Sequence, residues 1–345
     1  MKILVILDAF TDNLGDTAIA FCTKNMLLHR FPNAEVCFQS YRGKYSRPVR
    51  MNGKVKKYTR GILRHLKKIV PEKFIRRAHW YWQNRDEIRH KHRNTTYDLV
   101  AIGGGPLIDA YWMYPFAFWV WASKYHAFST NRVIMLGTGY GFNLSQFDKR
   151  LVSNALKNVK KAYLRDESSM VRFQQDFQYS SELMYDVAFT ISKFISANPR
   201  LNQVTFFPLW FDAVRKEYTY EAYFSHWLES AKDSYSKGYK IVLSTTETSQ
   251  DLNILKHLEA ELIVSNIPIE VIIPNNLNEL VATISASSAV FSGRMHALII
   301  GYSYGCECIA FPDTLKLTNF RTEILIPKTP LSSIIDNIFQ TFDTL

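Results

Sequence analysis

The fold is decided by the stretch Ser288-Ala-Val-Phe-Ser-Gly-Arg-Met-His-Ala-Leu-Ile-Ile-Gly-Tyr302. Its first five residues form a short apolar run typical of a buried strand. An apolar helical pattern over about 294–304 follows after a single glycine. A strand that turns at once into a helix is the repeating unit of a parallel sheet covered by helices. The stretch therefore predicts an α/β protein.

The same alternation recurs along the rest of the chain. Strands are also expected at 2–7, 97–102, 132–136, 161–164, 183–185, 203–208, 239–244, 269–273 and 306–311. Helices are also expected near 15–30, 106–128, 145–158, 167–176, 217–237, 249–265, 276–285 and 330–343. A polar, proline-containing stretch at 192–200 separates two such series. We therefore predict two tandem doubly wound, Rossmann-like domains that face a cleft.

The expected N-terminal domain spans residues 1–195 and contains a basic helical insertion at about 42–95. The expected C-terminal domain spans residues 203–328 and contains the Arg-x-His motif of the opening stretch. A C-terminal helix over 329–345 follows. Ligands of such folds bind outside the carboxyl ends of the strands, so candidate site residues are those that follow strands.

The insertion accounts for the basic character of the chain. The 345 residues include 42 Lys or Arg and 31 Asp or Glu, a formal net charge of +11. The segment from Arg42 to Arg93 contains 18 Lys or Arg and only three Asp or Glu. The rest of the chain therefore has a net charge of −4. Apolar residues at helical spacing around Pro71 predict two basic amphipathic helices, which favour contact with an anionic membrane surface. A solvated helix pair is the alternative. Nucleic acid is not expected, since no nucleic-acid motif accompanies the charge.

Several protein classes are excluded. The apolar run at the start is too short for a secretory signal, and the longest uncharged stretch, Ala110 to Ser123, is too short to span a bilayer. The four cysteines (Cys22, Cys37, Cys306 and Cys308) provide neither a disulfide framework nor a metal site and are expected as free thiols. We therefore expect a cytoplasmic protein without a metal or a cofactor.

One candidate ligand loop, Asn13-Leu-Gly-Asp16, follows the first expected strand. Asn13 and Asp16 place polar side chains at the start of a helix, where a carboxylate complements the helix dipole. Gly15 permits a tight turn or a close approach of a ligand to the backbone. A plain strand-to-helix turn explains the same residues equally well.

Two glycine-rich loops also follow expected strands. They are Gly103-Gly-Gly-Pro106 and Gly137-Thr-Gly-Tyr-Gly141. We expect Gly104, Gly105 and Gly139 to bring backbone N–H groups close to an anion. Pro106 suits the first position of the helix that is expected to follow. Turn geometry alone is the alternative.

The Arg-x-His pair of the opening stretch is the strongest candidate. Arg294 and His296 begin a helix, where free N–H groups and the dipole favour an anion. Arg294 adds a planar fork suited to phosphate or carboxylate, and His296 can exchange protons near neutral pH. A structural role is the alternative.

Two further candidates follow strands of the N-terminal half. Arg165 precedes Asp166, which can cap the next helix, and both follow the expected strand 161–164. Asp186 is a carboxylate at the end of the expected strand 183–185. A salt bridge or a cap explains each of them equally well.

In this order and spacing, these motifs resemble the polysaccharide pyruvyl transferase family. The matching elements are Asn13-x-Gly-Asp16, Gly103-Gly-Gly, Gly137-x-Gly, Arg165-Asp-Glu-Ser168, Asp186 and Arg294-Met-His-Ala-Leu298. The resemblance implies a fold similar to the two-domain GT-B glycosyltransferases. It also implies transfer of pyruvyl from phosphoenolpyruvate to a sugar, as a ketal on two hydroxyls of a surface or exopolysaccharide precursor.

The resemblance implies roles for these residues. Arg294 and its helix start would bind the donor anion, and His296 would donate the proton. Asp16 or Asp186 would accept the proton of the attacking hydroxyl. Acceptors in exopolysaccharide assembly are commonly lipid-linked, so the resemblance also implies a peripheral location at the inner face of the cell membrane.

The sequence departs from the family at one point. The first strand of the second domain often ends in an arginine in the family, whereas Gln203-Val-Thr-Phe-Phe-Pro-Leu-Trp210 contains none. A GT-B-like glycosyltransferase with a nucleotide-sugar donor therefore stays open. So does a non-catalytic lipid- or polysaccharide-binding protein on the same scaffold.

Overall fold

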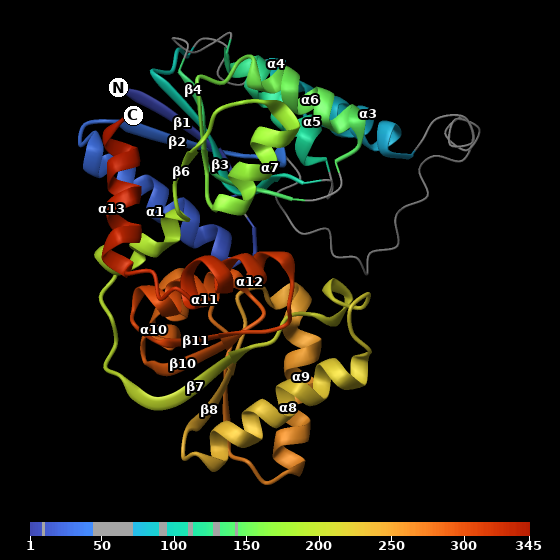
Figure 1. Cartoon of the computed structure of the whole chain (residues 1–345), viewed down its shortest axis with the longest axis vertical. Coiled ribbons are helices and arrows are strands. Elements are labelled where there is room, and N and C mark those ends of the chain that lie inside the picture. The colour runs from blue at the N-terminus through green and yellow to red at the C-terminus, as the bar shows by residue number, and fades with distance from the viewer. Residues whose placement is uncertain (9–10, 44–71, 90–94, 110–112, 127–131, 142–143) are drawn as a thin grey trace. The chain divides into compact units, whose positions relative to one another are not determined.

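The computed structural model describes residues 1–8, 11–43, 72–89, 95–109, 113–126, 132–141 and 144–345 (Figure 1). The chain forms two compact units. Unit 1 consists of Met1–Thr11 and Phe31–Leu183, and unit 2 consists of Asp12–Arg30 and Met184–Leu345. Each unit contains one parallel β-sheet, which confirms the predicted α/β class with two Rossmann-like sheets.

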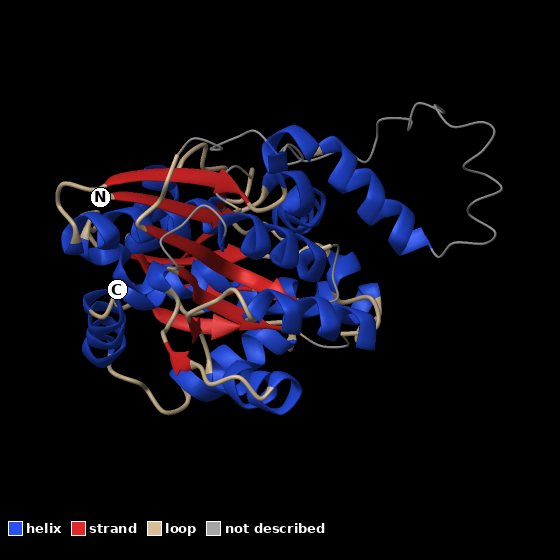
Figure 2. Ribbon diagram, turned by 90° about the horizontal axis from the view of Figure 1, so that it is seen from above, coloured by secondary structure: helices blue, strands red, loops and turns tan. Residues whose placement is uncertain are grey.

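The sheet of unit 1 has six strands in the order β2-β1-β3-β4-β5-β6. Their bounds are β1 Lys2–Leu7, β2 Glu35–Ser40, β3 Leu99–Ile108, β4 Val133–Tyr140, β5 Lys161–Leu164 and β6 Glu182–Leu183. The described helices of this unit are α3 Glu72–Gln83, α4 Arg85–Arg89, α5 Tyr114–His126, α6 Gln146–Leu156 and α7 Glu167–Phe177. Every pairing between neighbouring strands of this sheet is parallel. Figure 2 shows the strands of the chain in red among the blue helices.

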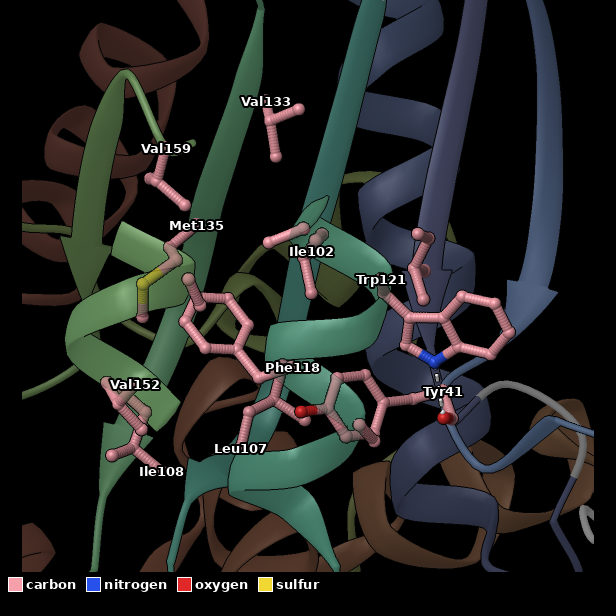
Figure 3. Close-up of a cluster of buried hydrophobic side chains, with 14 of the residues drawn as sticks. Tyr41, Ile102, Leu107, Ile108, Phe118, Trp121, Val133, Met135, Val152 and Val159 are labelled. Carbon is pink, nitrogen blue, oxygen red and sulfur yellow. Dashed lines mark hydrogen bonds between the residues drawn. The ribbon is translucent and has the colours of Figure 1, made fainter. Parts of the chain in front are cut away.

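The core of unit 1 forms where α5 packs on the sheet (Figure 3). Phe118 and Trp121 of α5 are fully buried together with Ile102 of β3 and Met135 of β4. The indole Nε1 of Trp121 donates a 2.9 Å hydrogen bond to the carbonyl oxygen of Tyr41, so the large apolar ring also satisfies its one polar atom. The helix covers one face of the sheet, and the strand residues that it buries alternate along the chain, as Leu4 and Ile6 of β1 do.

The glycine tracts extend the strands instead of starting helices. Gly103 pairs with Leu136 across β3 and β4, and a side chain at Gly103 would meet the Leu136 carbonyl oxygen at 1.8 Å. Gly104 and Gly105 have φ angles of +76° and +106°, which favour glycine. The prediction that Pro106 begins a helix is wrong, because β3 continues to Ile108 and α5 begins at Tyr114.

Helices α3 and α4 are the described helices of the basic insertion, and the basic helix expected before Pro71 lies outside the described residues. The side chain of Arg77 in α3 is buried. It pairs with Asp148 and lies over the ring of Phe147 at 4.9 Å. Trp82, on the same helix, is 60% exposed. The face of α3 that meets the core thus includes a basic side chain, and an aromatic one lies on its exposed face. Among the described helices, none is long and apolar enough to cross a membrane.

The sheet of unit 2 has five strands in the order β11-β10-β7-β8-β9. Their bounds are β7 Leu201–Phe207, β8 Lys240–Ser244, β9 Ile269–Ile272, β10 Ser287–Ser292 and β11 Glu307–Ala310. The helices are α1 Leu14–Arg30, α8 Tyr220–Ser236, α9 Thr248–Val264, α10 Leu277–Ser285, α11 Met295–Ser303, α12 Leu315–Phe320 and α13 Leu331–Asp343. Shorter turns are the 3-10 helices η2 Val187–Lys193 and η3 Phe211–Ala213 and the π-helix η4 Arg321–Leu325. All four cysteines of the chain are free thiols, as predicted.

The compact units differ from the expected domain ranges of 1–195, 203–328 and 329–345. Helix α1 belongs to unit 2, where it packs against η2, α10, α11 and α13. The ring of Phe21 in α1 lies 6.3 Å from that of Phe194, and Arg30 is 3.9 Å from Asp343 in α13. Helices α1 and α13 thus pack against each other within unit 2.

The Arg77–Asp148 pair makes a testable contribution to stability. Burial raises the pKa of Asp148, but a hydrogen bond from Ser145 and the charges of Arg77 and Lys73 outweigh it, so its pKa lies below the usual 3.8. The stabilisation is therefore present above pH 3.8 and is lost as the pH falls through the lower, folded-state pKa. We expect Asp148→Asn to lower the free energy of unfolding at pH 7 by about 3 kcal/mol in urea titrations.

The control is Asp86→Asn, because Asp86 is an exposed carboxylate 3.8 Å from Arg85. Its loss is expected to cost less than about 1 kcal/mol. Equal effects of the two substitutions would contradict a buried ion pair. The buried ion pair would also be contradicted if the difference in free energy of unfolding between Asp148→Asn and the wild type stayed the same as the pH falls below 3.8.

Candidate functional site

The sheet of unit 2 reverses its strand order between β7 and β10. Such a switch point is where open α/β sheets bind ligands, outside the carboxyl ends of the strands. The turn after β10 is tight: the Gly293 N–H donates to the Phe207 carbonyl oxygen at 3.0 Å. A Cβ at Gly293 would meet Cβ of Leu209 at 2.6 Å. Glycine therefore lets β10 turn directly into α11 beside the end of β7.

Arg294 is the N-cap residue of α11. Its N–H donates to Oγ of Ser292 at 2.8 Å, and that hydroxyl donates to the Arg294 carbonyl oxygen at 3.0 Å. The side chain leaves the helix and reaches the loop and first turn after β8. There Nε and Nη2 bond to Asp251 at 2.8 and 2.6 Å, and Nη1 bonds to Glu247 at 2.9 Å. Nη2 also donates to the side-chain oxygen of Gln250 at 3.2 Å.

Asp251 is the fixed centre of this cluster, since its side chain is fully buried. It also accepts hydrogen bonds from the Trp210 N–H and from the Thr245 hydroxyl, both at 3.1 Å. Burial disfavours the charged form of Arg294, but attraction to Asp251 and Glu247, with a smaller contribution from Asp16, raises its pKa. The guanidinium is thus a permanent cation that is already paired with carboxylates.

His296 lies in the first turn of α11, as predicted, and packs against the start of α1. A Cβ at Gly15 would meet Nδ1 of His296 at 2.5 Å and its Cβ at 2.8 Å. The other ring nitrogen, Nε2, is 3.5 Å from Oδ2 of Asp186. This Nε2 is buried and has no hydrogen-bond partner among the described residues. The ring is therefore positioned between the backbone of one helix and a carboxylate.

Two of the predicted residues, Asn13 and Asp186, hold the helix starts around His296 in place. Asn13 accepts the Gly15 N–H on its side chain at 2.9 Å and the Asp16 N–H on its carbonyl at 3.1 Å. Between them, the Leu14 N–H donates to the Thr246 carbonyl oxygen at 2.9 Å. Asp186 is the N-cap of η2 and accepts the Ala188 N–H at 3.0 Å.

The remaining predicted residues lie in unit 1. Gly139 leaves room for Arg165, whose Nε would lie 2.6 Å from a Cβ at that position. Arg165 is buried and lies 3.6 Å from Asp166, which caps α7 through a 2.7 Å bond from the Ser169 N–H. The capping prediction for Asp166 is confirmed. Gly104 and Gly105 lie within β3, and the next described helix begins only at Tyr114. They therefore do not lie at a helix start, where an anion site was predicted.

Sequence reasoning missed Glu247, Gln250 and Asp251. A signal was present: the expected strand 239–244 is followed by polar residues that open a helix, as at the other candidates. Parallel strands place their carboxyl ends at one edge of the sheet, so polar residues that follow strand 239–244 are candidates for the same site. The chemistry of the cluster is that of a fixed guanidinium and an imidazole among four carboxylates, able to bind polar groups and to transfer a proton.

Comparisons with known proteins identify the family and the fold of the chain. The family described as polysaccharide pyruvyl transferase matches residues 13–313. No curated protein matches the chain significantly. Among solved structures, a UDP-N-acetylglucosamine 2-epimerase described as putative, from Listeria monocytogenes, is 12% identical, with a TM-score of 0.53 over 98% of this chain and 90% of that one.

Two more solved structures are similar. The UDP-GlcNAc 2-epimerase from Neisseria meningitidis, bound to UDP-GlcNAc, is 13% identical, with a TM-score of 0.50 over 100% of this chain and 93% of that one. The ADP-heptose heptosyltransferase II of E. coli is 15% identical, with a TM-score of 0.42 over 99% of both chains.

The similarity to the epimerases shows the fold alone. The family match is stronger evidence, because it includes every residue of the unit 2 cluster. It runs from Asn13 at the start of α1 to residue 313, beyond the Arg-x-His pair. The chain therefore belongs to the polysaccharide pyruvyl transferase family, a family of transferases.

Proposed function

We propose that this protein transfers the pyruvyl group of phosphoenolpyruvate to two hydroxyls of a surface or exopolysaccharide precursor. The observation that carries the proposal is the position of His296. It is held in the first turn of α11 between Gly15 and Asp186, two residues after Arg294. An imidazole fixed beside a carboxylate is a general acid suited to one proton transfer.

In the proposed reaction, His296 donates a proton to the methylene carbon of phosphoenolpyruvate, which becomes a methyl group. Positive charge develops at C2, and a sugar hydroxyl adds there and loses its proton. The bond from C2 to the phosphate oxygen then breaks and phosphate leaves. A second hydroxyl adds at C2 and loses its proton, which closes the ketal. No electrons are gained or lost overall.

The carboxylates divide into two roles. Asp186 caps η2 and faces His296, so it is suited to orient the imidazole and to stabilise its protonated form. Asp16 is only partly buried, at the start of α1, and its charge acts on Arg294. Asp16 is therefore the better candidate to accept the proton of the attacking hydroxyl.

The first test is turnover. The wild type with phosphoenolpyruvate and a panel of glycosides should release phosphate and add a pyruvyl ketal to the product mass. His296→Asn should reduce kcat roughly 10²- to 10⁴-fold, the usual contribution of a general acid.

The control is His126→Asn, because His126 is exposed at the end of α5. No turnover of phosphoenolpyruvate across the panel, together with thermal stabilisation by a nucleotide-sugar, would instead favour a glycosyltransferase. Unchanged kcat in His296→Asn would remove the proposed proton donor.

The second test concerns the space for His296. Gly15→Ala adds a methyl group within 2.8 Å of the ring and Cβ of His296. Because the buried methyl group meets Cβ of His296, we expect a loss of about 1–3 kcal/mol in the free energy of unfolding, and displacement of the imidazole should reduce kcat by about tenfold or more. Gly301→Ala is the control, since it lies at the far end of α11. A Cβ at Gly301 would lie 3.0 Å from Cγ2 of Val290, its nearest neighbour. Full activity of Gly15→Ala would contradict the proposed position of the acid.

We also propose that α3 contributes to docking on an anionic membrane, where a lipid-linked acceptor would be found. Trp82 and Tyr81 are 60% and 36% exposed. The guanidinium of Arg85 lies 4.8 Å from the Trp82 ring. Exposed aromatic rings beside basic side chains are typical of interfacial helices. The 18 basic residues of segment 42–93 supply the charge complementarity.

Vesicle sedimentation tests this surface. Trp82→Ser should reduce binding to vesicles with anionic lipid several-fold at both low and high salt, and Arg85→Gln should reduce it only at low salt. Lys232→Gln, an exposed charge on α8, is the control. Activity on a soluble acceptor should be unchanged in all three. Equal binding of Trp82→Ser and wild type would exclude α3 as the docking face.

A further inference from the structure

The two carboxylates on Arg294 are held to very different degrees. Asp251 is fully buried and accepts bonds from the Trp210 N–H and the Thr245 hydroxyl besides those from Arg294. The side chain of Glu247 is 16% exposed and reaches Nη1 through Oε2 at 2.9 Å. Glu247 is the N-cap residue of α9, but its side chain makes no capping hydrogen bond. Movement of Asp251 would abandon a fully buried charge, whereas the carboxylate of Glu247 is already in contact with solvent.

The charges at this point oppose the binding of an anion. The carboxylate of Glu247 places a negative charge beside Nη1 of the guanidinium. Asp16 also acts on this guanidinium, because its charge helps to raise the pKa of Arg294. A phosphate or carboxylate oxyanion at Nη1 would meet like charge within a few ångströms while Glu247 stays in place. A ligand oxyanion that takes the position of Glu247 at Nη1 would exchange one anion for another on the same guanidinium.

We propose that Glu247 occupies the anion-binding edge of Arg294 in the ligand-free protein and is displaced when a ligand oxyanion binds. The identity of the ligand rests on the proposed function. In that function, the oxyanion is the phosphate or the carboxylate of phosphoenolpyruvate. The exchange itself needs only the shared chemistry, since either group matches the planar fork as the carboxylate of Glu247 does. Glu247 then sets the affinity for the donor by competing with it.

Inorganic phosphate is the direct probe. Isothermal titration of phosphate into Glu247→Gln should give a dissociation constant about tenfold lower than for the wild type, because the substitution removes the competing charge and keeps the shape. Phosphoenolpyruvate should show a similar gain. Glu259→Gln is the matched control: it removes the same charge from α9, about 18 Å further along the helix, and should change nothing. Glu247→Ala provides a second variant, and thermal unfolding verifies that each variant is folded.

A double variant shows whether the gain acts through Arg294. In an Arg294→Lys background, which keeps a cation but loses the planar fork, Glu247→Gln should gain less than twofold. The proposal is overturned if Glu247→Gln binds phosphate no more tightly than the wild type, if neither protein binds it at millimolar concentration, or if the gain persists without Arg294. Failure of the proposed reaction has a different signature: phosphate binding responds as described, but the wild type transfers no pyruvyl group from phosphoenolpyruvate.

Discussion

The buried ion pair between Arg294 and Asp251 is the constraint on which the site depends. Asp251 accepts bonds from residues that follow β7 and β8, and Arg294 follows β10. One carboxylate thereby joins the carboxyl ends of three neighbouring strands. Loss of either partner would leave a charge in a buried place, at a cost of several kcal/mol. The start of α11, and with it His296, is positioned by this pair.

The second constraint is steric and comes from the other end of the sequence. Gly15 lies 281 residues before His296, yet the absence of its side chain is what allows the imidazole to reach Asp186. The Gly15 N–H donates to the side chain of Asn13, and the Leu14 N–H of the same turn donates to a carbonyl oxygen in the turn after β8. A proton-transfer group is thus positioned by packing against backbone, which leaves little freedom for rotation.

Much of this fold follows from hydrophobic periodicity. The strand expected at 2–7 and the helix expected at 249–265 are found within one residue of those bounds, because continuous apolar runs and a 3.6-residue repeat have few other solutions. Strand β2 was missed, since its residues are mostly half-buried and carry no continuous apolar run. The start of α5 was misplaced because glycine followed by proline indicates a turn in sequence, whereas here pairing between β3 and β4 continues through it.

The candidate site was predictable where a residue follows its strand directly, as Arg294 and His296 do. It was not predictable where the decisive contact is an ion pair between distant segments. The pairing of Arg294 with Asp251, and of Arg77 with Asp148, joins residues 43 and 71 positions apart. Sequence patterns describe the faces of single elements, and they do not specify which charges meet after folding. The same limit applies to α1, whose amphipathic pattern predicts a buried face but not the unit that covers it.

That position of α1 has a consequence for biosynthesis. The helix is made within the first 30 residues, but the strands and helices that bury it follow residue 184. At roughly 5–20 residues per second, the ribosome takes on the order of ten seconds or more to reach these partners. The N-terminal unit can form around β1, β3, β4 and β5 in the meantime, whereas α1 must wait with its apolar side uncovered. Unit 2 therefore completes its fold only late in synthesis, after the residues that follow position 184 have been made.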